Sequence, residues 1–149
     1  RRRLGREAAV VATGGLAPVF EPELSCLHAV DPGLTLEGLR RNVGNARVLV
    51  GIEPRSNTMR SSVHVHELAP ALTAADRVWL LTGDGIDWDP HEVLAPLEGR
   101  GRVVMKGDDM LEQMLEAART GDHVVFMSNG GFDRAQFRFC AALEDRDPH

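Results

Sequence analysis

Short apolar runs alternate with stretches of helical periodicity along most of this chain. Continuous apolar runs, which are typical of buried strands, fall at residues 47–53, 77–82 and 123–127, and a short strand is expected at 102–105. Helical spacing of apolar positions falls at residues 34–43, 63–75, 90–97, 108–119 and 133–143. Strands that alternate with helices predict a Rossmann-like α/β fold, with a largely parallel sheet and helices on both faces.

Local signals place several helix ends. Asp89-Pro90 is typical of an N-cap followed by proline at the first helical position. Pro70 predicts a bend or a late start in its helix. The helix over 108–119 has acidic residues in its first turn, and Gly121 is expected to end it. One face of this helix is expected to lie in the core, and it is formed by Met110, Leu111, Met114, Leu115 and Ala118.

The first 33 residues follow a different pattern. Residues 8–12 and 17–20 could form two short strands around Gly14-Gly15, and these would make a β-hairpin at the edge of the sheet. We expect one domain over residues 1–149, with a divergent edge segment at 1–33 and an α/β core at 34–143. The length of 149 residues fits one domain.

Composition narrows the function classes. The net charge of -5 gives no basis for predicting nucleic-acid binding. No apolar run approaches the roughly 18 residues that a membrane span needs, so no membrane segment is predicted. Cys26 and Cys140 lack the spacing of a zinc site or a disulfide framework, and reduced thiols in a cytoplasmic protein are expected. Lys106 is the only lysine, so lysine chemistry is nearly excluded.

Polar clusters follow three of the expected strands. The sequences are EPRSNTMR at 53–60, TGDGIDWD at 82–89 and SNGG at 128–131. Ligands of open parallel sheets bind beyond the carboxyl ends of the strands, which makes these loops candidate sites. Arg55 and Arg60 could clamp a carboxylate or phosphate, or they could be surface arginines in weak ion pairs. The SNGG turn could favour an anion, or it could simply need a glycine at positive φ.

The sequence does not predict a metal site or a phosphate loop. His64 and His66 have no further ligand at suitable spacing, and Asp84, Asp87 and Asp89 are expected to form a solvated loop. The patterns G-x-x-x-x-G-K-S/T, G-x-G-x-x-G and G-x-S-x-G are all missing. Nothing in this chain is expected to bind ATP phosphates and magnesium by itself.

Several motifs together resemble one family. EPRSNTMR is followed by V-H-x-x-E-L at 63–68, by ADRVWLL at 75–81 and by DHVVFMSNGGF at 122–132. With TLEGLRRNVGNARV at 35–48, they resemble in order and spacing the C-terminal domain of the murein tripeptide ligases, which belong to the ATP-dependent Mur ligases. The resemblance covers roughly residues 35–143.

The resemblance implies roles for particular residues. The tripeptide or the acyl-phosphate region would meet Arg55, Ser56, Asn57, Thr58 and Arg60. The opposite wall would be formed by Ser128, Asn129 and Gly130. The family has an Asp-Phe-Ala-His-His-Pro-type stretch against the nucleotide. Its counterpart at 25–32 retains Pro32 and, with a shift, His28 or Asp31.

The resemblance also implies the third domain of a three-domain enzyme that joins L-Ala-γ-D-Glu-meso-diaminopimelate to UDP-N-acetylmuramate in peptidoglycan recycling. The other domains would hold the UDP-sugar, ATP and Mg, so this chain alone is expected to be inactive and to contain no catalytic residue. One alternative is the same domain of another Mur ligase, such as the alanine-adding enzyme. Another is a stand-alone α/β binding module without catalysis.

Overall fold

The computed structural model describes residues 11–12, 29–30, 34–55, 60, 65–83, 85–128 and 132–146. The chain divides into two compact units, Arg1–Asn42 and Val43–His149. Each unit is described by itself below. The expectation of one domain over residues 1–149 stays a prediction.

The first unit contains two very short strands and most of one helix. Strand β1 (Val11–Ala12) pairs in parallel with β2 (Ala29–Val30), and α2 spans Leu34–Val43 as expected. Glu37 in the first turn of α2 lies 2.5 Å from Arg41, one turn further on. The hairpin expected over residues 8–20 falls mostly outside the described residues, and of it only β1 is seen.

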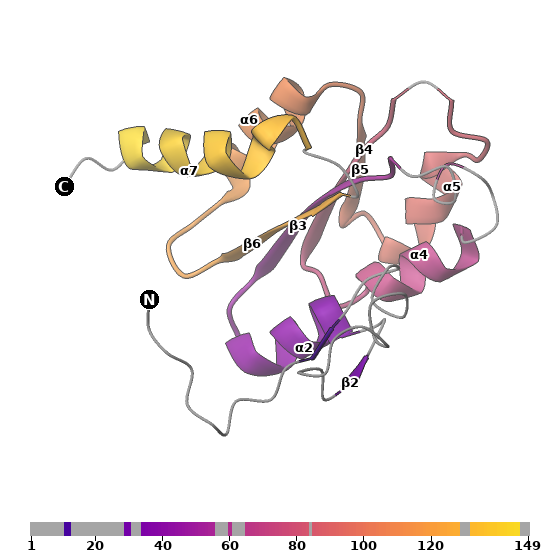
Figure 1. The fold of residues 1–149 in the computed structure, drawn as a ribbon, viewed down its shortest axis with the longest axis horizontal. Helices are drawn as coiled ribbons and strands as arrows, with labels where there is room; N and C mark the ends of the chain where they lie inside the picture. Colours follow the sequence, from indigo (N-terminus) through magenta and orange to yellow (C-terminus); the bar gives the residue numbers. More distant parts are fainter. Residues whose placement is uncertain are drawn as a thin grey trace. The chain divides into compact units, whose positions relative to one another are not determined.

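The second unit is built on a four-stranded, entirely parallel sheet (Figure 1). Its strands are β3 (Val48–Glu53), β4 (Arg77–Leu81), β5 (Gly101–Val104) and β6 (His123–Ser128), in the order β5-β4-β3-β6. The sequence placed all four strands to within about a residue, and the parallel α/β class is confirmed. The expected burial of the last strand was wrong, because β6 is an edge strand and is only half-buried.

Helices follow the strands as the periodicity predicted. They are α4 (Val65–Leu72), α5 (Pro90–Leu94) with the 3₁₀ turn η3 (Ala95–Leu97), α6 (Gly107–Ala117), and η4 (Phe132–Arg134) leading into α7 (Ala135–Arg146). Asp89 is the N-cap of α5, and its side chain accepts a hydrogen bond of 2.8 Å from the His91 N–H. Pro70 lies inside α4 near its C-terminal end.

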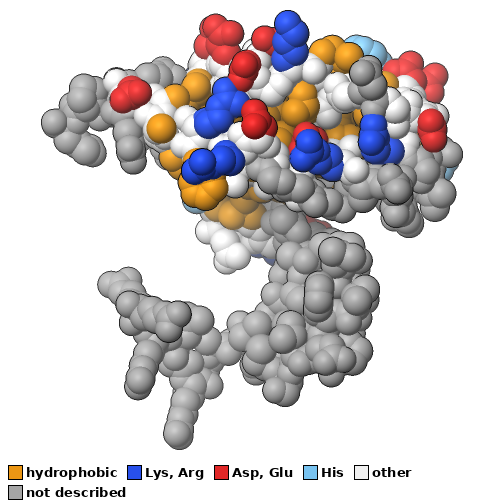
Figure 2. Space-filling view, turned by 45° about the horizontal axis from the view of Figure 1, so that its top comes forward, with side chains coloured by type: hydrophobic (Ala, Val, Ile, Leu, Met, Phe, Trp, Pro, Cys, Tyr) orange, Lys and Arg blue, Asp and Glu red, His pale blue; other side chains and the backbone are white. Residues whose placement is uncertain are grey.

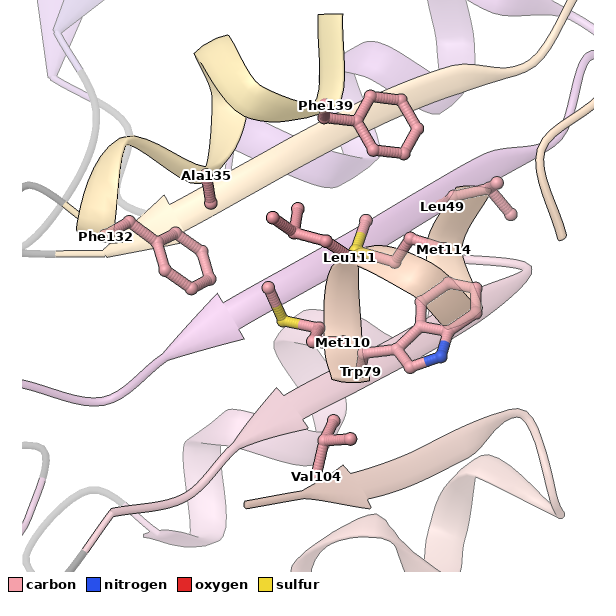
Figure 3. Packing of buried hydrophobic residues seen from close by; sticks show 9 residues of the cluster. All are labelled: Leu49, Trp79, Val104, Met110, Leu111, Met114, Phe132, Ala135 and Phe139. Carbon is pink, nitrogen blue, oxygen red and sulfur yellow. The ribbon is translucent and has the colours of Figure 1, made fainter. Parts of the chain in front are cut away.

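Different helices pack against the two faces of the sheet, α6 and α7 on one face and α4 and α5 on the other (Figure 1). Leu49, Trp79 and Val104 face α6 and the segment η4–α7 (Figure 3). From the helices, this cluster receives Met110, Leu111, Met114, Phe132, Ala135 and Phe139. On the other face Gly101 lies against α5, since a Cβ there would lie 3.0 Å from Leu94 Cβ. Burying each large apolar side chain contributes roughly 1.5–3 kcal/mol, so these two layers supply much of the stability.

An ion pair at the amino ends of the strands joins β3 to β6. The Arg47 guanidinium donates to both carboxylate oxygens of Asp122, at 2.9 and 2.5 Å, and also to the Ala117 carbonyl at the end of α6. The Arg119 N–H donates a third hydrogen bond to this carboxylate, at 2.8 Å. The Asp122 side chain is 7% exposed and the Arg47 side chain is 28% exposed, so the carboxylate is largely shielded from water and the guanidinium only partly.

The ion pair predicts how stability depends on pH. Burial raises the pKa of Asp122, but the hydrogen bonds from Arg47 and Arg119, with their positive charges, outweigh burial and hold this pKa below its ordinary value. A depressed pKa stabilises the fold above the unfolded-state pKa of about 3.9, and the contribution is lost as pH falls through the folded-state pKa. Asp122→Asn should lower the free energy of unfolding at pH 7 by about 1.5–3 kcal/mol, because charge-assisted hydrogen bonds are lost.

Urea unfolding of wild type and Asp122→Asn between pH 7 and pH 2 would check this. The two free energies of unfolding should converge as the pH drops below about 4. Asp109→Asn removes an exposed carboxylate outside this pair and should keep the wild-type acid dependence. A constant gap between wild type and Asp122→Asn across this range would show that the ion pair contributes nothing that titrates.

Candidate functional site

The sheet reverses its order between β3 and β6. The chain moves outward from β3 to β4 and then β5, and it returns to the other side of β3 to form β6. In an open parallel sheet, ligands bind beyond the carboxyl ends of the two strands that flank such a reversal, which here are β3 and β6. The loops EPRSNTMR and SNGG begin at these two strand ends, so the reversal brings together two of the three predicted loops.

Three side chains meet at the carboxyl ends of β3 and β6. Glu53 and Ser128 are register partners at the last positions of β3 and β6. The Ser128 hydroxyl donates to Glu53 Oε2 at 2.9 Å, and Arg55 Nε lies 3.5 Å from Glu53 Oε1. Both carboxylate oxygens of Glu53 therefore have a partner, one from each strand end.

Glu53 and Arg55 differ in their exposure to solvent. Glu53 is 17% exposed and Arg55 is 59% exposed, so the carboxylate lies beneath and the guanidinium reaches solvent. An exposed ion pair of this kind contributes little to stability, at most about 1 kcal/mol. It can nevertheless orient the guanidinium, whose other N–H groups are suited to a carboxylate or phosphate.

Arg60 has a different place from Arg55. Its Nε donates to the Gly85 carbonyl at 3.2 Å, and its own carbonyl accepts from the Asp87 N–H at 3.0 Å. Arg60 thus joins the loop after β3 to the loop after β4. Gly85 has φ of 86°, and a Cβ there would lie 2.8 Å from Arg60 Nη2, so glycine suits both the backbone and the contact.

The remaining predicted site residues lie outside the described residues and stay predictions. They are Ser56, Asn57, Thr58, Asn129 and Gly130 for the substrate, and His28, Asp31 and Pro32 for the nucleotide. Glu53 was not among the predicted site residues. Its signal was present in the sequence, because it is the first polar residue of EPRSNTMR, but its pairing with Ser128 needs the strand register.

The acidic loop after β4 contributes to a separate cavity. A space of about 740 Å³ lies between α4 and α5, and its lining includes His66, Asp87, Trp88 and Asp89. Asp89 is occupied as the helix cap. Within the described ranges, no three His, Cys, Asp or Glu side chains are grouped so as to hold a metal ion. In the same residues, no helix is long and apolar enough to cross a membrane.

Comparison with known proteins gives two kinds of match. The UDP-N-acetylmuramate–L-alanyl-γ-D-glutamyl-meso-2,6-diaminoheptanedioate ligase of Escherichia coli K12 is 41% identical over 103 residues, which are 66% of this chain and 22% of that protein. A solved domain described as part of such a ligase from Haemophilus ducreyi has a TM-score of 0.61 at 32% identity, covering 74% of this chain and 80% of that domain. The chain thus spans about a fifth of the length of its curated ligase relatives.

The second kind of match is shorter and of higher identity. The type III pantothenate kinase of Moorella thermoacetica is 62% identical over 37 residues, which are 25% of this chain and 15% of that protein. Kinases with the same name from three other bacteria match over 36 to 39 residues. No protein-family model matches the chain.

Proposed function

We propose that this chain is the domain of a murein peptide ligase that positions the incoming peptide. The basis is that the chain belongs to the murein peptide ligase family of Mur ligases. The product would be the amide between the carboxyl of UDP-N-acetylmuramate and the amine of L-Ala-γ-D-Glu-meso-diaminopimelate. Such an enzyme would act in the cytoplasm, in peptidoglycan recycling. The domain alone would be inactive.

One observation supports a peptide site at the carboxyl ends of β3 and β6. Glu53 accepts from Ser128 on one oxygen and lies beside Arg55 on the other, at the point where the strand order reverses. The tripeptide of the related ligases is rich in carboxylates. A guanidinium fixed from behind by a carboxylate loses less conformational freedom when it binds such a group. In this proposal Arg55 binds the peptide, and Glu53 and Ser128 position it.

ATP and Mg would be held mainly by other domains of the ligase. The sequence has no G-x-x-x-x-G-K-S/T loop and a single lysine, Lys106, so the residues present do not fit a phosphate and magnesium site of their own. The partners of this domain would therefore be the UDP-sugar domain and the ATP-binding domain of the same enzyme.

Arg55→Ala in a full-length ligase that contains this domain tests the peptide site. Loss of one charge-assisted contact of about 1.5–3 kcal/mol should raise the KM for the tripeptide by roughly one to two decades. The KM for ATP should change far less, because the nucleotide is held elsewhere. Steady-state kinetics with tripeptide and ATP varied separately would measure both.

Arg138→Ala is the matched control, since it also removes an exposed arginine that has carboxylate partners, Asp108 and Asp133, on the surface of α7. It should keep wild-type kinetics for both substrates. Unchanged tripeptide kinetics in Arg55→Ala would reduce EPRSNTMR to an ordinary surface loop.

We infer further that the ligase relationship belongs to Val43–His149, and that the similarity to pantothenate kinases belongs to Arg1–Asn42. Sizes support this assignment. The second unit has 107 residues, close to the 99 to 103 of the ligase matches, while 36 to 39 kinase-like residues fit within the 42 of the first unit. The two kinds of match together cover nearly the whole chain without having to overlap.

If the two units have different evolutionary origins, residues 25–32 need not match the Asp-Phe-Ala-His-His-Pro-type stretch that lies against the nucleotide in the Mur ligases. His28, Asp31 and Pro32 would then have no counterpart role in the ligase. The ligase domain, which was expected to cover residues 1–149, would then cover only the second unit, Val43–His149. Residues 35–42, the first part of TLEGLRRNVGNARV and most of α2, would then belong to the kinase-like segment and not to the ligase, contrary to the resemblance described above.

Hydrogen exchange on the complete chain tests whether the two units fold separately. Met114 is fully buried beneath β3, so Met114→Ala should lower the free energy of unfolding of the second unit by about 2–5 kcal/mol. It should speed amide exchange throughout residues 43–146 and leave exchange in residues 1–42 unchanged. Glu112→Ala, at an exposed position of the same helix, should alter neither unit. If Met114→Ala raised the amide exchange rates equally in both units, the two units would form one cooperative domain.

A further inference from the structure

The loop TGDGIDWD follows β4 and supplies none of the three side chains that meet at the carboxyl ends of β3 and β6. It is nevertheless connected to EPRSNTMR, because Arg60 makes hydrogen bonds with two of its residues, Gly85 and Asp87. These contacts bear on the task of Arg60, for which the resemblance implies contact with the substrate.

The loop after β4 is held at both of its ends. At its start, Thr82 is 4% exposed, its N–H donates to the Val104 carbonyl at 2.8 Å, and its hydroxyl donates to the Met105 sulfur at 3.1 Å. At its end, Asp89 caps α5 and accepts a 2.8 Å hydrogen bond from the His91 N–H. A loop that is fixed by a buried strand end and by a helix cap is a firm support for a residue of another loop.

Arg60 contacts this support through its side chain and through its backbone. Its Nε donates to the Gly85 carbonyl at 3.2 Å, and its own carbonyl accepts from the Asp87 N–H at 3.0 Å. The guanidinium lies so close to Gly85 that a Cβ there would be 2.8 Å from Arg60 Nη2. Only glycine leaves the guanidinium in its place, so the contact depends on residue 85 as well as on residue 60.

Surface charge alone does not mark Arg60 as a ligand of an anion. Figure 2 shows basic and acidic side chains interspersed over the described surface that it displays. The guanidinium of Arg55 is 59% exposed and has the carboxylate of Glu53 behind it, whereas Arg60 Nε donates to a backbone carbonyl. The geometry thus separates the two arginines, because Arg55 reaches solvent and Arg60 joins two loops.

We propose that Arg60 is a positioning residue, which holds the end of EPRSNTMR against the loop after β4 and acts on the peptide only through EPRSNTMR. This inference rests on the proposed function. In the sequence, the predicted substrate residues 56–58 lie between Arg55, which Glu53 holds, and Arg60. A segment anchored at both ends has less conformational freedom to lose on binding. Release of one anchor therefore weakens binding without removing a contact to the substrate.

Two variants of a full-length ligase that contains this domain remove the anchor in different ways. Arg60→Ala deletes the side chain, and Gly85→Ala displaces the guanidinium. Each should raise the KM for the tripeptide about tenfold. The double variant should be little worse than either single one, because both changes remove the same contact. Steady-state kinetics with the tripeptide varied at saturating ATP would measure these values.

Arg60→Gln separates the positioning role from a direct contact with the substrate. Glutamine places an N–H donor at the same point of the side chain as arginine Nε, but it has no positive charge. It should therefore keep the hydrogen bond to the Gly85 carbonyl and nearly the wild-type KM for the tripeptide. A rise in this KM as large as that of Arg60→Ala would show a charged ligand of the substrate and would overturn the proposal.

Gly99→Ala is the matched control for Gly85→Ala. Gly99 has a φ of 81°, close to the 86° of Gly85, but a Cβ there would meet no atom of the described residues within 4 Å. The control introduces a similar backbone strain without displacing a side chain, and it should keep the wild-type KM. A wild-type KM in Gly85→Ala as well would overturn the proposal.

Amide exchange in the chain itself distinguishes a failure of this inference from a failure of the proposed function. The Asp87 N–H donates to the Arg60 carbonyl, so its exchange reports whether Arg60 stays in place. Arg60→Ala and Gly85→Ala should speed exchange of this amide about tenfold, and Arg60→Gln should not. Unchanged exchange in the first two variants would overturn the inference. Accelerated exchange together with wild-type tripeptide kinetics in Arg55→Ala would overturn the proposed function instead.

Discussion

The Arg47–Asp122 ion pair fixes which strand lies beside β3, and the proposed peptide site depends on that choice. Arg47 immediately precedes β3 and Asp122 immediately precedes β6, so the bidentate contact brings the two strands together at their first residues. Once the start of the ladder is set, the side-chain period of two carries the register to Glu53 and Ser128 at the other end. A slip by one residue would turn Ser128 to the other face and break its bond to Glu53.

Packing on one face of the sheet supports the same arrangement of β3 and β6. The core on one face is apolar and is closed by α6 and α7, which hold β6 against the sheet despite its edge position. Phe126 on β6 makes edge-to-face contacts with Phe132 and Phe139, at ring centroid distances of 5.7 and 5.6 Å. The carboxyl end of β6 is therefore positioned by packing, and the hydrogen bond from Ser128 to Glu53 links it to the end of β3.

Much of this fold could be read from the sequence, because strands and helices here have strong periodic signals. The N-cap at Asp89 and the buried face of α6 with Met110, Leu111 and Met114 were predicted and are confirmed. The order of the strands could not be read, since periodicity carries no information on neighbours, and β6 was wrongly expected to be buried. The contact between Glu53 and Ser128 was not predicted for the same reason: it depends on which residue is paired with Glu53 across the ladder.

The central claim is that Glu53 and Ser128 act as one unit that positions a peptide-binding arginine. A double-mutant cycle with Glu53→Ala and Ser128→Ala in a full-length ligase containing this domain, followed through the KM for the tripeptide, tests this claim most directly. Residues that share one hydrogen bond should show a coupling energy of about 0.5–3 kcal/mol, so the double variant should be little worse than either single one. Strictly additive effects, or no effect on the KM for the tripeptide in any variant, would contradict the account.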